Sequence, residues 1–429
     1  MSSKINRLEI SYKNLSDKFL ITTQNYQMQF SHLYAHRLSE CTKLLTPKVL
    51  AKWGTEFPIK KLCELREDVT EKCILIGTLF KHQAFKPSIL REISEENQLA
   101  PQPPRQHYAD SDDKLILEDE LQRVRLFGQI NVRFMATGVV CAVLGTIEDD
   151  GKFIVEDTVF LESGPQRELA SLPKPASIIL ISGLNQIHCH EFSESLNMFQ
   201  HWLSGNIDPS VKNCTRLIIA GNSVRSCAER KQFGLQMKSS ESNDTVLAVK
   251  NLDKYFASWS QSIYIDLMPG EFDPATFMLP QQPFHRCMFP QASRNSSFHS
   301  VSNPYACEIG NRLVVGTSGQ NVRDLLRNTN LEDPLEALRS TLQWGHISPT
   351  SPDTLACYPY VESDPFIMKE CPSVYFVGNC DEFKTEIHNG SDGQKTRIVC
   401  VPEFSKTQSI AVVDLDSLNC RSVSFKVVE

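Results

Sequence analysis

Two unbroken runs of apolar residues place the strongest constraint on the fold of this 429-residue chain. Ile178–Ile181 and the aliphatic part of Arg216–Ala220 lack the alternation of a strand that is solvated on one face. Strands of this kind are buried on both faces, as in parallel sheets that are covered on both sides. Between them, Leu196, Phe199 and Leu203 recur at helical spacing. The alternation of strand and helix predicts a layered α/β domain.

Further segments extend this pattern to the end of the chain. The expected strands are Ile263–Leu267, Leu313–Gly316, Val374–Val377, Arg397–Val401, Ile410–Leu415 and Val423–Val427. Apolar positions within 249–259 and 322–326 predict helices. Another helix is predicted to begin after Asp333, with Asp333 as N-cap, Pro334 at the first position and Glu336 at the third. We expect the α/β domain to cover residues 174–429.

The N-terminal segment, residues 1–54, is of a different kind. Met1–Asn25 is polar and weakly periodic, and we expect it to be a loose lead-in. From Phe30 the apolar residues recur at helical spacing until Pro47, which is predicted to end the helix. A shorter helix is expected to run as far as Gly54. We expect the whole segment to pack on the α/β domain.

Residues 55–165 are rich in β-strand patterns. The expected strands are Lys72–Phe80, Leu115–Leu126, Gly138–Leu144 and Phe153–Val159. Asp149-Asp150-Gly151, between the last two strands, is a hairpin signal. Short strands, glycines within two of them and long connections predict a small closed barrel of the oligonucleotide/oligosaccharide-binding type.

Charge and composition limit the functions that such a chain can have. Barrels that bind single-stranded nucleic acid combine aromatic residues with a basic groove, but these strands carry Glu118, Asp119, Glu120, Glu156 and Asp157. The chain's net charge of −7 also disfavours independent binding to a polyanion, although a local basic patch remains an alternative. No apolar run is long enough to cross a bilayer, and no cysteine spacing indicates zinc. His188 and His190 are the one close histidine pair, and we expect no cofactor.

The loop after Ile263–Leu267 lies where open α/β sheets hold their ligands, at the carboxyl end of a strand. It reads Pro269-Gly270-Glu271-Phe272-Asp273, which by itself could be an ordinary turn. It also resembles the calcineurin type of metallophosphoesterase, which has Pro-Gly-Asn-His-Asp at this place. In that type the Asn binds metal and the His faces the phosphate, so Glu271 and Phe272 replace both functional side chains.

The other strand ends depart from the metallophosphoesterase pattern in the same way. Two metal ions need carboxylate, imidazole and amide ligands from successive strands. Where that pattern has ligands, this chain has Gly183, Asn185, Asn222, Arg225, Glu271, Phe272, Asp273, Ser318, Asn379 and Asp381. We therefore expect a phosphodiesterase fold that has no metal site and no catalytic residue.

Several longer strings resemble the family of second (small, B) subunits of eukaryotic DNA polymerase delta. They are Lys61–Leu65, Pro87–Ile93, Pro101–Pro104, Leu117–Arg123, Asp149–Phe153, Met268–Pro274, Leu279–Pro283, Gly316–Asn321, His346–Thr350 and Pro352–Thr354. That family joins an oligonucleotide-binding-type barrel to an inactivated calcineurin-like phosphodiesterase domain. The resemblance implies a nuclear, non-catalytic scaffold in DNA replication and repair.

The same resemblance implies two protein partners for the chain. They are the cysteine-rich C-terminal domain of the polymerase's catalytic subunit and a third, regulatory subunit; DNA would be contacted only through the complex. The alternatives are a metal-dependent phosphodiesterase or exonuclease and an autonomous single-stranded-DNA-binding protein. For the apolar, proline-rich loop 268–289 we expect burial in the α/β core and against the barrel, or a surface for a partner, with Phe277, Phe284 and Phe289 as its candidate residues.

Overall fold

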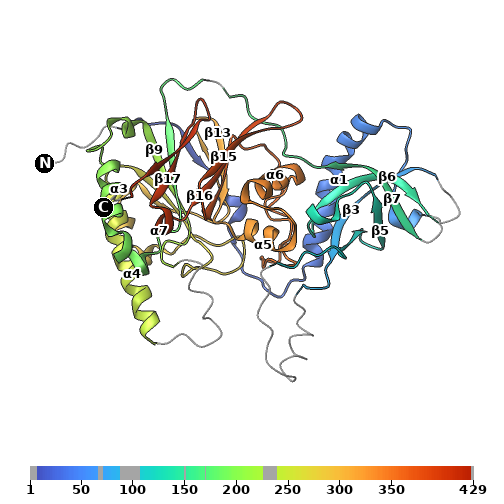
Figure 1. Ribbon diagram of the computed structural model, residues 1–429, viewed down its shortest axis with the longest axis horizontal. Helices are drawn as coiled ribbons and strands as arrows, with labels where there is room; N and C mark the ends of the chain where they lie inside the picture. The colour runs from blue at the N-terminus through green and yellow to red at the C-terminus, as the bar shows by residue number, and fades with distance from the viewer. Residues whose placement is uncertain are drawn as a thin grey trace. The chain divides into compact units, whose positions relative to one another are not determined.

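A computed structural model describes residues 7–65, 71–86, 107–148, 151–169, 171–225 and 239–426 (Figure 1). Its chain divides into two compact units. The first, here called the two-sheet unit, comprises Met1–Gln24, Pro165–Gln320 and Glu370–Glu429; the second, the strand-ring unit, comprises Asn25–Gly164 and Asn321–Lys369. The units differ from the sequence-based domains at 321–369, which the sequence pattern had assigned to the α/β domain.

Two six-stranded sheets form the two-sheet unit. Sheet I has the order β1 (Tyr12–Asn14), β12 (Tyr305–Ile309), β13 (Arg312–Thr317), β14 (Val374–Cys380), β16 (Lys395–Pro402) and β15 (Lys384–Asn389). Sheet II has the order β11 (Phe298–Ser300), β10 (Tyr264–Met268), β9 (Cys214–Ala220), β8 (Ser177–Ile181), β17 (Ser409–Asp414) and β18 (Cys420–Ser424). The centres of both sheets are parallel, as the unbroken apolar runs predict.

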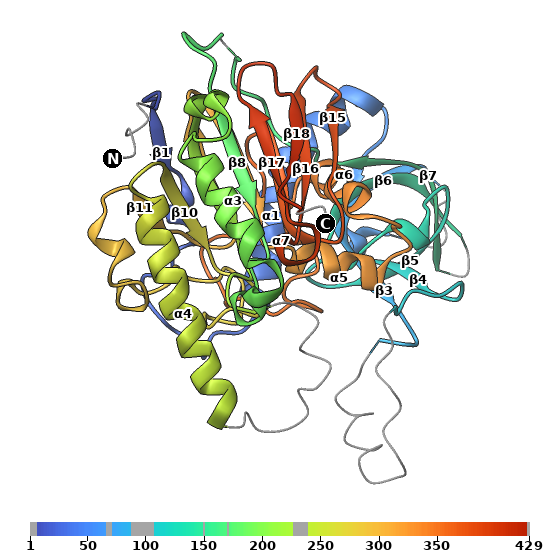
Figure 2. The same ribbon diagram turned by 60° about the vertical axis from the view of Figure 1, so that its left-hand side comes forward.

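Successive residues of one strand serve two different cores. Ile178 and Leu180 of β8 belong to the core between the sheets, which also contains Phe376 of sheet I. Ile179 and Ile181 of the same strand face α3 (Ser193–Leu203) and α4 (Ser239–Trp259), the helices that cover sheet II in Figures 1 and 2. The alternation explains why the four residues Ile178–Ile181 are all apolar, because neither face of the strand meets water there.

The N-terminal residues are more ordered than the sequence indicates. β1 pairs antiparallel with β12, and Arg7 donates hydrogen bonds to the carbonyls of Leu203, Val211, Cys214 and Ser262. Our expectation of a loose lead-in is therefore wrong for the described part of Met1–Asn25. The apolar periodicity of this segment is low because its order comes from a short edge strand and from the Arg7 guanidinium, which donates to backbone carbonyls. Neither feature needs a regular apolar pattern.

In the strand-ring unit, five strands pair in an order that returns to its start. The order is β3 (Cys73–His82), β4 (Lys114–Glu118), β5 (Arg123–Gly128), β7 (Lys152–Phe160) and β6 (Val140–Ile147), and β6 pairs again with β3. A short strand, β2 (Ile59–Lys60), lies beside β3. The antiparallel pairing of β6 with β7 agrees with the hairpin predicted there, although Asp149 and Asp150 lie outside the described residues.

One predicted strand of this ring is in fact two. Leu115–Leu126 turns back on itself at Asp119, whose carboxylate accepts hydrogen bonds from the backbone amides of Leu121 and Gln122. This side-chain-to-backbone turn competes successfully with a continuous strand because it satisfies the amides that the ladder leaves unpaired. The family strings Pro87–Ile93 and Pro101–Pro104 also lie outside the described residues.

Helix α1 (Ser31–Trp53) runs through Pro47 and ends at Gly54, so the predicted end at Pro47 is wrong. Cys41, Leu45 and Val49 form one buried stripe that packs with ring residues such as Val140 and Ala142. Apolar side chains are buried before and after Pro47, and this burial offsets the loss of the one backbone hydrogen bond that proline removes. The helix also contacts the 321–369 segment, since Arg37 binds Asp364 and the carbonyls of that segment.

Two further helices belong mainly to the strand-ring unit, namely α5 (Gln320–Asn328) and α6 (Pro334–Trp344). The predicted start of α6 is confirmed, because the Asp333 carboxylate accepts a hydrogen bond from the Glu336 amide at 2.9 Å. A last short helix, α7 (Phe404–Thr407), lies in the two-sheet unit. Among the described residues, none of the helices is both long and apolar enough to cross a membrane.

Candidate functional site

The strand ends that carry the predicted site positions meet in the two-sheet unit. β8, β9 and β10 are parallel neighbours, so the loops that follow them leave the same edge of sheet II. The amide of Gly183 donates to the Gly221 carbonyl at 3.0 Å, and the Asn185 amide donates to the Asn222 carbonyl at 3.2 Å. From sheet I, Asn379 reaches the same place, because its Nδ2 donates to the Ala220 carbonyl at 3.0 Å.

The loops after β9 and β10 lie in direct contact. Asn222 is fully buried, and its Oδ1 accepts a hydrogen bond from the Phe272 amide at 3.2 Å. A Cβ atom on Gly270 would lie 2.2 Å from the Asn222 backbone nitrogen, so no other residue fits at Gly270. The Asn222 side chain is thus engaged by the neighbouring backbone, and the close approach at Gly270 leaves no room between the two loops.

Ser318 and Asn379 join the end of sheet I to that of sheet II. Ser318 is fully buried, and its hydroxyl donates to the Pro269 carbonyl at 2.7 Å. Besides Ala220, the Nδ2 of Asn379 also donates to the Ser318 carbonyl, at 2.8 Å. Both side chains therefore donate hydrogen bonds to backbone carbonyls of neighbouring segments. These bonds hold the strand ends of the two sheets together.

Asp273 is the one carboxylate of the degenerate set that is buried at the centre of these loops. Its oxygens accept hydrogen bonds from the backbone amides of Val224 at 2.8 Å and Gly270 at 2.9 Å. Burial raises the pKa of Asp273 to about 6, although the surrounding backbone amides act in the opposite direction. The cost of removing the carboxylate from water thus exceeds the stabilisation from its amide donors.

Three asparagines at these strand ends have left-handed backbones, with φ of 39° at Asn185, 52° at Asn222 and 61° at Asn379. Asparagine is one of the few residues other than glycine that adopts this conformation readily. One amide atom of each asparagine is buried without a protein partner among the described residues. Residues with neutral amide side chains therefore make the sharp bends at these three strand ends.

The side chains at the other predicted positions lie in varied surroundings. Arg225 donates to the Thr245 hydroxyl of α4 at 2.6 Å. Asp381 is exposed and pairs with Lys406 at 3.2 Å. Glu271 and Phe272 are both half-buried. His188 is exposed, and the side chain of His190 lies outside the part of the chain that the structure describes.

A buried amide network next to the degenerate positions was not predicted. Gln281 Nε2 donates to the Gly270 carbonyl at 2.9 Å, while its Oε1 accepts from Asn303 at 2.8 Å and from Gln320 at 2.7 Å. Asn303 in turn accepts from the Ser318 amide at 3.0 Å. These two glutamines and the asparagine are distant in sequence, and the strings Leu279–Pro283 and Gly316–Asn321 pointed only to the glutamines.

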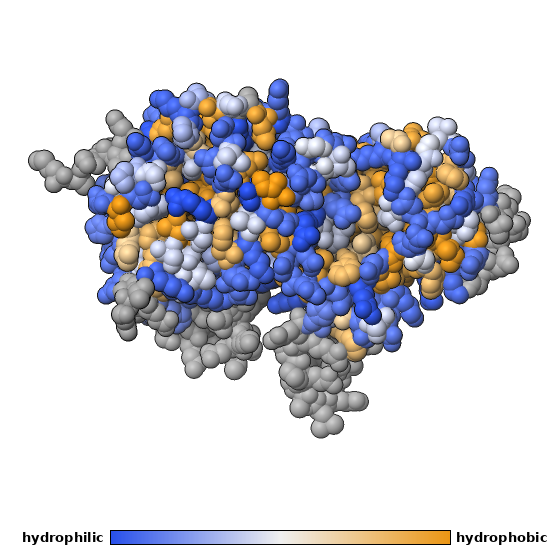
Figure 3. Space-filling model, turned by 45° about the horizontal axis from the view of Figure 1, so that its top comes forward, coloured by the Kyte–Doolittle hydropathy of each residue, from blue (hydrophilic) through white to orange (hydrophobic). Residues whose placement is uncertain are grey.

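The candidate core or partner loop, residues 268–289, divides into buried and exposed parts. Phe284 and Phe289 belong to the core beneath α4, with ring centroids 5.6 Å apart. Phe277 is 61% exposed, so it does not take the core position, and the alternative of a surface for a partner stays a prediction. On the face shown in Figure 3, apolar residues occur in small groups separated by polar ones.

A pair of metal ions does not fit the residues present here. Asn222 Oδ1 and both Asp273 oxygens accept backbone hydrogen bonds, and Asn379 presents its donor nitrogen to carbonyls. Within the described residues, no three His, Cys, Asp or Glu side chains group so that they could hold a metal ion. The arrangement can brace loops, and it offers no set of anionic or imidazole ligands.

Comparison with known families divides the chain into two matched regions. Residues 29–158 match the family model of the DNA polymerase delta subunit OB-fold domain. Residues 178–385 match the family model that describes the B subunit of DNA polymerase alpha/epsilon. The first region contains α1 and the strand ring, and the second contains the strand ends described above.

Three curated proteins resemble the chain along nearly its whole length. DNA polymerase delta subunit 2 of Drosophila melanogaster is 61% identical over 98% of this chain and 99% of its own. The DNA polymerase delta small subunit of Oryza sativa subsp. japonica is 37% identical over 98% of each chain. The small subunit from Saccharomyces cerevisiae is 28% identical over 99% of this chain and 93% of its own.

Proposed function

Because the chain belongs to the family of DNA polymerase delta small subunits, we propose that it is a non-catalytic accessory subunit of this polymerase in DNA replication and repair synthesis. The observation that carries the proposal is the extended identity with named small subunits, which includes both the ring-containing region and the two-sheet region. In this role the chain links the catalytic subunit, through its cysteine-rich C-terminal domain, to a third regulatory subunit.

The proposal includes a lost enzymatic site. We infer that the two-sheet unit is a calcineurin-like phosphodiesterase domain whose metal ligands have been replaced, and that the strand ring is a closed barrel of the oligonucleotide-binding type. Parallel strands that end at one edge, with sharp left-handed bends, support the first inference. The pairing of β6 back to β3 supports the second. The former site is used to hold loops together.

Co-expression tests the linking role directly. The tagged catalytic subunit is expressed with the third subunit, in the presence and in the absence of this chain. We expect the third subunit to co-elute with the tag only when this chain is present. Equal recovery of the third subunit without this chain would refute the linking role, and failure of this chain to bind the catalytic subunit would refute the accessory role.

A nuclear location follows from the same proposal. A fluorescent fusion of the full chain, expressed at its native level, is expected to accumulate in the nucleus during DNA synthesis. Exclusion of the fusion from the nucleus through the whole cell cycle would contradict the proposal. A fusion that retains co-elution with the catalytic subunit serves as the control for a correctly folded protein.

A further inference from the structure

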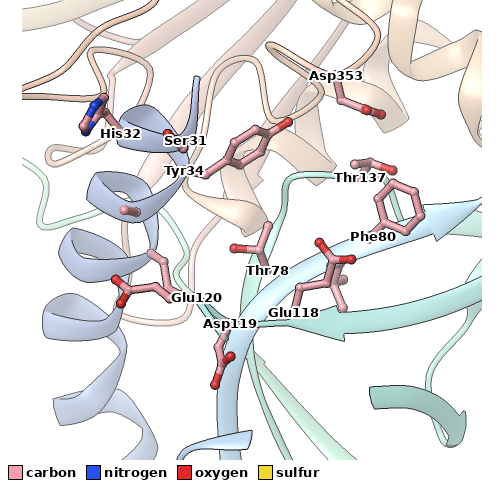
Figure 4. Close-up of a pocket in the computed structure, with 13 residues that line it drawn as sticks. Ser31, His32, Tyr34, Thr78, Phe80, Glu118, Asp119, Glu120, Thr137 and Asp353 are labelled. Atoms are coloured by element: carbon pink, nitrogen blue, oxygen red, sulfur yellow. The ribbon is translucent and has the colours of Figure 1, made fainter. Parts of the chain in front are cut away.

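A cavity of about 650 Å³ lies in the strand-ring unit, between α1 and the strands β3 and β4. Its size is within the usual range for sites that enclose a ligand or a side-chain anchor. The residues that line it are Ser31, His32, Tyr34, Ala35, Leu38, Thr78, Leu79, Phe80, Glu118, Asp119, Glu120, Thr137 and Asp353. Figure 4 shows Tyr34, Thr78 and Glu118 facing the same space, whereas Asp119 points away from it.

The cavity's charged side chains are predominantly carboxylates, and no lysine or arginine is among its lining residues. Glu118 and Asp353 are each about three-quarters buried, with 28% and 22% of the side chain exposed. Burial raises the pKa of Glu118, Arg123 lowers it, and Asp353 raises it further. The negative charges of the two carboxylates therefore repel each other across the cavity.

Tyr34 lies beside the two carboxylates. Burial is the main reason why the pKa of its phenol is raised to about 12; Asp353 and Glu118 raise it further, whereas Arg37, whose guanidinium lies 5.8 Å from the centre of the ring, lowers it. A cation placed between Glu118 and Asp353 would relieve the repulsion between their negative charges.

The cations that already pair with these carboxylates do not line the cavity. Glu118 lies 3.4 Å from Arg123, whose side chain is 70% exposed, and such a surface pair contributes little. Asp353 forms an ion pair with Lys86, which leaves its second oxygen available for another donor. The carboxylates of Glu118 and Asp353 can therefore still accept hydrogen bonds from a group that enters the cavity.

The remaining wall of the cavity is apolar and aromatic. Leu38 of α1, Leu79 and Phe80 of β3 and the ring of Tyr34 contribute to it. Aromatic faces beside carboxylates suit a guanidinium, which stacks on rings and donates several hydrogen bonds in one plane. A lysine ammonium is less suited because it is compact and strongly hydrated. Nucleic acid is disfavoured, since its phosphates would meet carboxylates.

We propose that this cavity is a docking site for an arginine side chain presented by a segment of another protein subunit. An apolar neighbour of that arginine would cover Leu38 and Phe80. That the arginine comes from a polymerase subunit rests on the proposed accessory function. The selectivity for arginine does not, because it follows from the lining residues alone.

Binding of a peptide probe tests the selectivity with the full chain by itself. The probe is fluorescein-labelled Leu-Arg-Leu amide, and the matched control is the same peptide with citrulline, which keeps the shape of arginine and removes its charge. We expect the citrulline peptide to bind more weakly by roughly tenfold or more. Equal binding of the two peptides, or no binding of the arginine peptide at millimolar protein, would overturn the proposal.

Variants locate the binding. E118Q and D353N are each expected to weaken the binding of the arginine peptide by roughly tenfold and to leave the binding of the citrulline peptide unchanged. E156Q is the matched control, because Glu156 is an exposed carboxylate of β7 that does not line the cavity and pairs with Lys72. Thermal unfolding checks that each variant is folded. Loss of binding in E156Q, or none in both cavity variants, would contradict the assignment.

A photo-crosslinker at His32 in the assembled polymerase complex tests the source of the arginine. We expect cross-links to an arginine-containing segment of one other subunit, and we expect E118Q to diminish them. Cross-links to DNA instead would overturn the protein part of the proposal. If the peptide binds but the complex yields no cross-link to a subunit, the partner assignment fails and the arginine site remains. If co-elution of the subunits fails as well, the accessory function itself is refuted.

Discussion

The carboxylate of Asp273 accepts a hydrogen bond from the backbone amide of Val224 at 2.8 Å and so connects the loop after β10 to the loop after β9. Asn222 and Phe272 form a second link between these two loops. Both links are hydrogen bonds from a backbone amide to a side chain, and the carboxylate of the first makes the stability of these loops depend on pH.

The pH dependence of Asp273 has a defined sign. Because its pKa is about 6 in the folded chain and near 3.9 when unfolded, the folded state binds the proton more tightly. Its contribution to stability is therefore fully present below pH ~4 and is lost as the pH rises through about 6. Relative to D273N, we expect the wild type to lose about 3 kcal/mol of unfolding free energy between pH ~4 and ~7.

Thermal unfolding of both proteins over this pH range measures the difference. D381N is the matched control, since Asp381 is an exposed carboxylate near the same strand ends, and its difference from wild type should stay flat. A pH-independent difference for D273N would show that the carboxylate is not protonated near neutral pH.

Arg37 is expected to be essential for the stability of the strand-ring unit. Its side chain is fully buried, binds Asp364 at 2.6 Å and donates to the carbonyls of Pro349 and Ser351. Arg37→Ala leaves a buried carboxylate without its main partner, so we expect a loss of about 3–5 kcal/mol in unfolding free energy. Urea denaturation measures it, with Arg123→Ala as an exposed control that should cost less than about 1 kcal/mol. Equal losses in both variants would contradict this role.

The two phenylalanines of loop 268–289 should behave in opposite ways. Phe284→Ser removes a buried ring from the core under α4 and is expected to cost about 3 kcal/mol or more. Phe277→Ser changes a residue that is 61% exposed and should leave the melting temperature nearly unchanged. If the exposed part faces a partner, Phe277→Ser will reduce co-elution with another subunit. Unchanged co-elution would remove Phe277 from the interface.

We expect no phosphodiesterase activity from the chain. Hydrolysis of bis-p-nitrophenyl phosphate with Mn²⁺ should not exceed the background, because the side chains at the strand ends bind backbone groups in place of metal. The control preparation carries D273N and N379A and is purified identically. Activity that is present in the wild type and absent from the control would show a working site.

The isolated chain should bind single-stranded DNA weakly. Its net charge is −7, and the cavity beside β3 and β4 is lined by carboxylates. Fluorescence anisotropy with oligo(dT) at physiological salt is expected to give no submicromolar binding. A submicromolar affinity that falls steeply with added salt would instead indicate a basic surface that the sequence does not reveal.

Local patterns in the sequence were sufficient for many elements. The consecutive apolar residues of β8 and β9 predicted strands buried on both faces, and the Asp333-Pro334 start of α6 is confirmed by its capping bond. These features are visible because each depends on residues within a few positions of one another. The same local rules failed at Pro47, where packing against the ring keeps α1 continuous.

The sequence by itself determined the family, the central strands of the two sheets, and the residue types at the strand ends. Only the tertiary structure decided what those residues touch. It placed Gln281 between Gly270, Asn303 and Gln320 and buried Phe284 while exposing Phe277. It also formed a cavity, open to solvent, that Tyr34, Glu118 and Asp353 line. The physical reason is that periodicity reports which face of one segment is buried, whereas these contacts join segments separated by tens to hundreds of residues and arise only when the segments pack.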